Sequence, residues 1–112
     1  MLLRRGDIVL TNFTPARDAE ANYLRPAVIV SNNHVNAFAP VVMVVPLTSN
    51  VAKLYPSDLF LPLHCTGLDR DSKARVELMR HVNVNRIIRP LGLVPPDLME
   101  QLDQRLREHL AL

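Results

Sequence analysis

The sequence has little of several residue types on which common protein chemistries depend. A single cysteine, Cys65, excludes an intrachain disulfide and fits a reducing compartment. The three glycines are too dispersed to form a phosphate-cradling loop, and there is no Gly-x-Ser-x-Gly nucleophile motif. Two tyrosines, three phenylalanines and no tryptophan exclude extended base stacking as the main binding device.

Long apolar segments and metal-ligand spacings are also missing. No apolar run approaches the length of a membrane span, and Arg4 and Arg5 follow the apolar start, which is the wrong order for a signal peptide. We therefore expect a cytoplasmic protein that does not contact a membrane. The histidines are scattered without the paired spacing of zinc sites, so we expect no metal and no other cofactor.

The residues that are present describe a globular chain with a bias toward arginine. With 112 residues, of which 48% are hydrophobic and 21% charged, we expect one domain over residues 1–112. Eleven of the 13 basic residues are arginine, and the excess of basic groups lies before residue 96. Arginine binds phosphate through a planar fork, so the bias suits a nucleic-acid partner, although simple compositional bias explains it equally well.

Hydrophobic patterning predicts a mainly β protein with one terminal helix. The apolar and alternating runs predict strands over residues 8–13, 27–30, 41–45, 59–63, 73–84 and 86–92. In the long strand 73–84, alternation would turn Leu78 toward the core, and we read the Asn-rich residues 31–39 as a turn. Leucines at 98, 102, 106 and 110 follow Pro95-Pro96 and predict an amphipathic helix. Together these elements indicate a small barrel of antiparallel strands.

Two polar residues lie at the ends of predicted core strands. Arg25 stands just before the strand 27–30 and is held extended by Pro26, while Thr48 follows the strand 41–45. The long polar connection before Arg25 carries Arg17 and Glu20, and long connections in compact domains are usually functional. Taken alone, Arg25 is also compatible with an ordinary arginine at the edge of a strand.

Several segments in this order resemble the MazF/PemK family of toxin endoribonucleases. The resemblance covers nearly the whole chain and rests on these segments and on the terminal helix: Arg5-Gly6-Asp7-Ile8-Val9, Phe13-Thr14-Pro15, Glu20, Arg25-Pro26-Ala27-Val28-Ile29-Val30-Ser31-Asn32, Val45-Pro46-Leu47-Thr48-Ser49 and Gly67-Leu68-Asp69-Arg70-Asp71-Ser72.

The resemblance implies an SH3-like barrel, a homodimer, and metal-independent cleavage of single-stranded RNA at short sequences. It further implies inhibition by a cognate acidic, MazE-like antitoxin, with which such toxins bind DNA. Arg25 and Thr48 match the family's catalytic arginine and threonine, and Glu20 matches its loop glutamate. Two departures bear on the target sequence more than on the chemistry: the loop reads Asp18-Ala19-Glu20-Ala21-Asn22-Tyr23 in place of Gly-Ser-Glu-Gln-x-Gly, and Leu78 replaces a usual glutamine.

Metal-free RNA cleavage needs a cation for the phosphorane, a base for the 2′-OH and an acid for the leaving oxygen. We assign Arg25 as the cation and Thr48 as a hydroxyl that orients a phosphate oxygen. Glu20 is either the base or a charge partner of Arg25. For RNA binding we expect Arg17 together with the polar side of the long strand, which carries Arg75, Glu77, His81 and Asn83. Two rival functions are a topoisomerase-poisoning toxin on the same barrel and a non-catalytic RNA-binding module.

Overall fold

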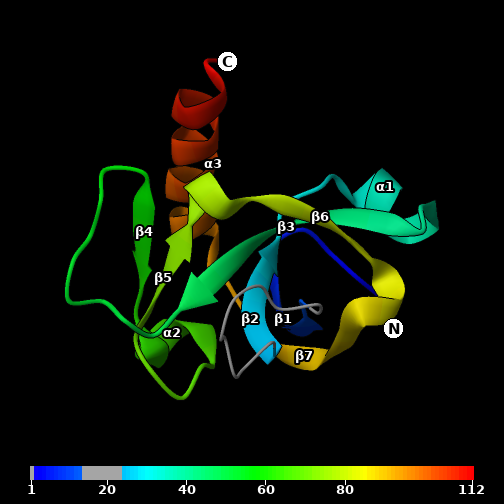
Figure 1. Cartoon of the computed structure of the whole chain (residues 1–112), viewed down its shortest axis with the longest axis horizontal. Helices are drawn as coiled ribbons and strands as arrows, with labels where there is room; N and C mark the ends of the chain where they lie inside the picture. The colour runs from blue at the N-terminus through cyan, green and yellow to red at the C-terminus, as the bar shows by residue number, and fades with distance from the viewer. Residues whose placement is uncertain (1, 14–23) are drawn as a thin grey trace.

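β-Strands form most of the regular structure of the computed structural model, which describes residues 2–13 and 24–112. Within these residues, seven strands make one antiparallel sheet in the order β4-β5-β3-β2-β1-β7, and β6 pairs with β3 (Figure 1). The elements in chain order are β1 (Asp7–Asn12), β2 (Leu24–Ile29), α1 (Asn33–Phe38), β3 (Val41–Thr48), β4 (Asp58–Leu61), α2 (Leu63–Thr66), β5 (Ser72–Arg75), η1 (Val76–Leu78), β6 (Arg80–Asn83), η2 (Val84–Arg86), β7 (Ile87–Leu93) and α3 (Pro96–Leu110).

Strand β3 connects the two sides of the molecule. It pairs with β2 on one edge, and on its other edge with β6 over residues 41–44 and then with β5 over residues 47–48. Figure 1 shows it crossing from the side of β6 to the side of β4 and β5. A run of β-branched residues favours such a strand because it is buried on both faces. The prediction of a core strand over residues 41–45 is therefore confirmed.

Apolar side chains from the two faces of the sheet enter two separate core clusters. The first contains Val28, Val45 and Leu102, and the second contains Ala27, Val44 and Val82. Helix α3 covers the first cluster, where Leu102 is fully buried and Leu98 and Leu106 pack against it. The prediction of a mainly β fold with a terminal amphipathic helix is confirmed. In the described part of the chain, no helix has both the length and the hydropathy needed to cross a membrane.

Two short helices replace turns or extended chain that the sequence suggested. In α1, the side chain of Asn32 accepts a hydrogen bond from the Val35 N–H (2.9 Å), which caps the helix at its start. Helix α2 is capped at its C-terminus by Gly67, whose φ of 83° lies in the left-handed region. Both helices are too short to show a 3.6-residue hydrophobic period, which is why periodicity did not reveal them.

The expectation of one long strand over residues 73–84 was wrong. The segment is divided into β5 and β6 by the 3₁₀ turn η1, because the two strands pair with different stretches of β3. The turn shifts the alternation of side chains, and Leu78 is 49% exposed instead of facing the core. The ladder along β3 is therefore interrupted at η1.

Gly92 in β7 allows the backbone of α2 to approach closely. A Cβ atom at this position would lie 1.9 Å from the carbonyl oxygen of Thr66. We predict that Gly92→Ala destabilises the protein by about 2 kcal/mol, because backbone must move to make room. Chemical denaturation measures the loss. Gly67→Ala is the comparison: its Cβ has ordinary space, and only the strain of a positive φ, about 1 kcal/mol, should appear. A loss at Gly92 smaller than that at Gly67 would contradict the prediction.

Candidate active site

Arg25 and Thr48 lie on neighbouring strands and on the same face of the sheet. Strands β2 and β3 are antiparallel with Ala27 opposite Pro46. Continuing this register by two residues on each strand places Arg25 opposite Thr48. Directly opposed side chains in an antiparallel pair have Cβ atoms about 5 Å apart. Both residues belong to the strands themselves, not to the segments before and after them as the sequence suggested.

A pocket of about 390 Å³ contains both side chains. Its walls come from the start of β2, the end of β3 and the turn that precedes β5. The turn contributes Asp69 and Arg70, and Ser72 comes from the first position of β5. The pocket therefore combines two arginines, hydroxyl groups and one carboxylate, a set suited to a phosphodiester with its sugar and base.

The Thr48 hydroxyl has a defined hydrogen-bond role. Its Oγ1 accepts a hydrogen bond from the Asn50 N–H at 3.2 Å. A threonine hydroxyl carries one donor and two acceptor positions, and among the described residues the O–H of Thr48 has no acceptor, so it can donate. This arrangement orients Thr48 as a donor to an oxygen bound in the pocket.

Arg25 is half-buried and is not paired with a carboxylate of the described residues. A guanidinium in this position offers its planar fork to a bound anion, and partial burial strengthens the interaction relative to open water. Of the other predicted residues at this site, Glu20 and Arg17 fall outside the described residues.

Arg75 and Glu77 lie in an ion-pair cluster and do not line the pocket of Arg25. Arg75 pairs with Glu77, and its Nε lies 3.3 Å from Oδ1 of Asp58. The hydrogen bond to Glu77, together with the charge of Asp58, raises the pKa of Arg75 above its ordinary value. Its guanidinium therefore stays charged and is already paired with two protein carboxylates, although Nε of Arg75 and Oδ1 of Asp58 make no hydrogen bond within the described residues.

His81 and Asn83 are exposed on β6, on the opposite face of the sheet from Arg25. Val82, between them, faces the core cluster that also holds Ala27 and Val44, and neighbouring residues of a strand point to opposite faces. The Asn83 side chain accepts a hydrogen bond from the Asn85 N–H at 3.0 Å. The structure thus separates these two predicted contacts from the Arg25–Thr48 pocket.

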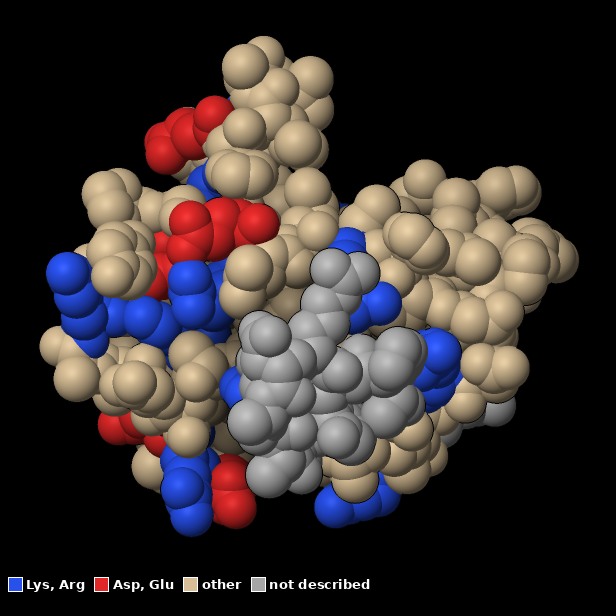
Figure 2. All heavy atoms as spheres, in the orientation of Figure 1, with Lys and Arg blue, Asp and Glu red and all other residues tan. Residues whose placement is uncertain are grey.

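Sequence reasoning did not select two charged residues that line this pocket, nor a third, Arg80, on the same face of the sheet. Asp69 and Arg70 line the pocket, and Arg80 shares the sheet face of Arg25 and lies with its guanidinium carbon 5.2 Å from the centre of the Phe13 ring. The signal for the first two was available, because the turn 67–72 was part of the family resemblance. Arg80 could also have been selected, because it interrupts the apolar side of the predicted strand 73–84. Figure 2 shows basic side chains across this face of the molecule, from the side of β4 and β5 to the side of β6.

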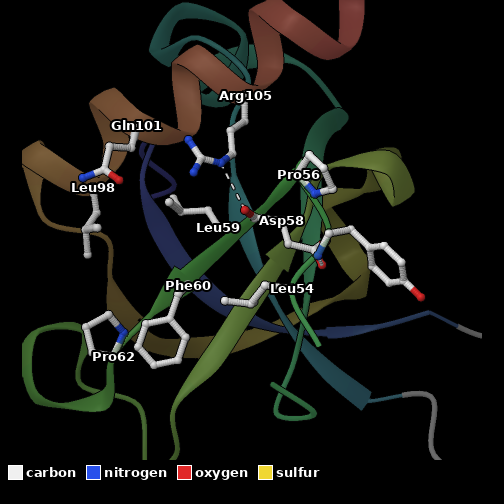
Figure 3. A pocket seen from close by; sticks show the side chains of 10 residues that line it. Leu54, Pro56, Asp58, Leu59, Phe60, Pro62, Leu98, Gln101 and Arg105 are labelled. Carbon is white, nitrogen blue, oxygen red and sulfur yellow. Dashed lines mark hydrogen bonds between the residues drawn. The ribbon is translucent and has the colours of Figure 1, made fainter. Parts of the chain in front are cut away.

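A second pocket, of about 520 Å³, lies between β4, the chain before it and α3 (Figure 3). Its lining is mainly apolar and includes Leu54, Phe60 and Leu98. Arg105 on its wall donates a hydrogen bond to the Asp58 carbonyl oxygen at 3.0 Å, drawn as the dashed line in Figure 3. The Asp58 carboxylate is already paired with Lys73 and Arg75, and among the described residues this pocket does not bring together an arginine and a threonine hydroxyl as the pocket of Arg25 and Thr48 does.

Comparison with known proteins gives consistent matches over the whole chain. The family model described as PemK-like, MazF-like toxin of type II toxin-antitoxin system matches residues 4–110. Endoribonuclease MazF9 of Mycobacterium tuberculosis is 45% identical over 116 residues, covering 99% of this chain and 98% of the relative. Endoribonuclease EndoA of Bacillus subtilis is 26% identical, with 100% and 97% covered. The crystal structure of MazF from Deinococcus radiodurans superposes with a TM-score of 0.83 at 26% identity, covering 100% of this chain and 99% of the other.

Proposed function

The chain belongs to the PemK-like, MazF-like family of type II toxin–antitoxin toxins, and on that premise we propose that it is an endoribonuclease that cuts single-stranded messenger RNA. Cutting messenger RNA would block translation and growth and would place the activity in the cytoplasm. The observation that carries the proposal is the meeting of Arg25 and Thr48 in one pocket. A surface that only bound RNA or a topoisomerase would not require this pair at opposed strand positions.

The proposed reaction uses the substrate's own nucleophile. The 2′-oxygen attacks the adjacent phosphorus, the bond from phosphorus to the 5′-oxygen breaks, and the products are a 2′,3′-cyclic phosphate and a 5′-hydroxyl. Arg25 binds two non-bridging oxygens through its fork as negative charge accumulates on them. The Thr48 hydroxyl donates to a phosphate oxygen and fixes its orientation.

Two protons must move in this reaction. The proton of the 2′-OH passes to a base, and the leaving 5′-oxygen receives a proton. Glu20 stays the proposed candidate for the base, with charge pairing to Arg25 as the alternative role. No metal ion is needed in this scheme, because the nucleophile comes from RNA and the charge is stabilised by Arg25.

The other predicted RNA contacts remain proposals. His81 and Asn83 would contact a part of the RNA that extends beyond the pocket and passes around the edge of the sheet. Arg75 would have to exchange its contacts with Asp58 and Glu77 for a phosphate. Arg17 would contribute from the connection before β2. As partners we propose a second copy of the chain and a cognate acidic, MazE-like antitoxin that covers Arg25.

Mapping the ends of cut RNA tests the proposed function. Purified protein incubated with a long single-stranded RNA in EDTA should produce defined fragments with 2′,3′-cyclic phosphate and 5′-hydroxyl ends. Arg25→Ala protein purified in the same way is the control for contaminating nucleases. Loss of activity with the chelator would overturn the metal-free scheme. Binding without cleavage would favour the RNA-binding module, and inhibition of a topoisomerase without cleavage would favour the rival toxin.

A further inference from the structure

The turn from Gly67 to Asp71 is firmly anchored next to the active site. At its start, the Thr66 hydroxyl donates to the Pro62 carbonyl oxygen (3.0 Å) and accepts from the Leu68 N–H (3.3 Å). At its end, Oδ1 of Asp71 accepts a hydrogen bond from the Leu63 N–H at 2.9 Å. These bonds are local and tie the turn to α2, so the residues between them are held in a fixed position.

Asp69 and Arg70 occupy the middle of this anchored turn and line the pocket of Arg25 and Thr48. Both are exposed, and within the described residues neither side chain takes part in a salt bridge or a hydrogen bond. By contrast, the carboxylate of the neighbouring Asp71 is used within the protein, where it accepts the Leu63 N–H. Two unpaired charges on a rigid wall of the pocket are available for a ligand.

The chemistry of a carboxylate restricts which base it can bind. An ionised Asp accepts hydrogen bonds and donates none. Adenine, cytosine and guanine each carry an exocyclic amino group on the edge that single-stranded RNA exposes, whereas uracil presents one N–H between two carbonyl oxygens. A carboxylate that faces those oxygens places one hydrogen-bond acceptor against another. Uracil is therefore disfavoured, because the oxygens repel one another and no hydrogen bond replaces those lost to water.

We propose that Asp69 reads a nucleotide next to the cleaved bond, accepting an amino-bearing base and rejecting uracil, while Arg70 holds the phosphate beside it. This inference rests on the proposed function, because it assumes that RNA occupies the Arg25–Thr48 pocket. It makes the turn 67–71 a determinant of target sequence. Arg70 contributes affinity without sequence information, since phosphate contacts position a strand but do not identify its bases.

The test measures RNA binding, so its result does not depend on whether the protein cuts RNA. The full-length chain is mixed with a random pool of single-stranded RNA in which 2′-fluoro groups replace the nucleophile, and the bound fraction is sequenced and aligned. Wild-type protein should deplete uracil about tenfold at one aligned position. Asp69→Asn should remove most of that depletion, because an amide can also donate to a uracil oxygen. Glu100→Gln, an exposed carboxylate on α3 outside the pocket, is the matched control and should keep the wild-type profile.

Arg70→Gln should weaken binding of the same pool for all sequences alike and reduce the slope of binding against salt by about one. Arg89→Gln, an exposed arginine on β7 outside the pocket, should leave the slope unchanged. An identical base profile for wild-type and Asp69→Asn protein, an aligned pool without uracil depletion, or no binding of the pool would overturn the inference. If the proposed function is wrong, unmodified RNA will stay uncut. The base profile of the 2′-fluoro pool can still be measured in that case, so the two failures can be told apart.

Discussion

Replacing Arg25 with alanine should lower the rate of RNA cleavage by at least about a hundredfold. Losing one fixed donor to a developing oxyanion costs about 3 kcal/mol of transition-state stabilisation, and Arg25 is the cation that we assign to the phosphorane. Single-turnover cleavage of a defined RNA measures the effect. The variant should remain folded, because Arg25 is half-buried at the start of β2 and lies outside both core clusters.

Two further variants define what the arginine and its neighbour contribute. Arg25→Lys keeps the charge but loses the planar fork, so it should restore little activity. Thr48→Val keeps the shape of the side chain but removes the hydroxyl that we propose donates to a phosphate oxygen, so it should also slow cleavage. Arg89→Gln removes an exposed arginine that does not line the pocket and is the control. A folded Arg25→Ala protein that cuts RNA at the parental rate would end the proposed mechanism.

Replacing Asp58 with asparagine should destabilise the protein by about 3 kcal/mol. The Asp58 side chain is fully buried, and its Oδ2 lies 3.1 Å from Nζ of Lys73, which is 6% exposed. Removing one partner of a buried ion pair leaves the other charge uncompensated, and such losses run to about 3–5 kcal/mol. Oδ2 also accepts the Tyr55 N–H at 2.9 Å, so the carboxylate holds the chain before β4 as well. Equilibrium unfolding in urea measures the change.

The control for Asp58 is the exposed member of the same cluster. Glu77→Gln breaks the pair with Arg75 near solvent and should cost less than about 1 kcal/mol. Adding Lys73→Met to Asp58→Asn removes the orphaned charge, so the double variant should lose less stability than the two single variants combined. Equal losses for Asp58→Asn and Glu77→Gln would show that the buried pair does not contribute as proposed. Because Lys73 lies opposite Thr48 in the β3–β5 ladder, cleavage by these variants also reports how far the cluster supports the active site.

Local periodicity alone determined the class of the fold. The alternating or continuous apolar residues of β1 and β3 and the leucine spacing of α3 are visible without tertiary contacts, because burial of one face imposes a period of 2 or 3.6. Arg25 and Thr48 could be selected for a similar reason, since each stands at the edge of an apolar run and interrupts its pattern with a polar group.

The tertiary structure decided which of these residues act together. The register between β2 and β3 sets Arg25 opposite Thr48, and pairing partners far apart in the chain cannot be read from either strand alone. The division of the long strand into β5 and β6 placed His81 and Asn83 on the other face and turned Leu78 outward, because β3 offers each strand a separate stretch of its edge. The folding of β4, β5 and the turn between them onto β3 likewise decides two further features. It buries Asp58 with Lys73, and it brings Asp69 and Arg70 to the pocket. Charge identifies such residues in a sequence, but only packing determines whether a charge is neutralised inside the protein or left available for RNA.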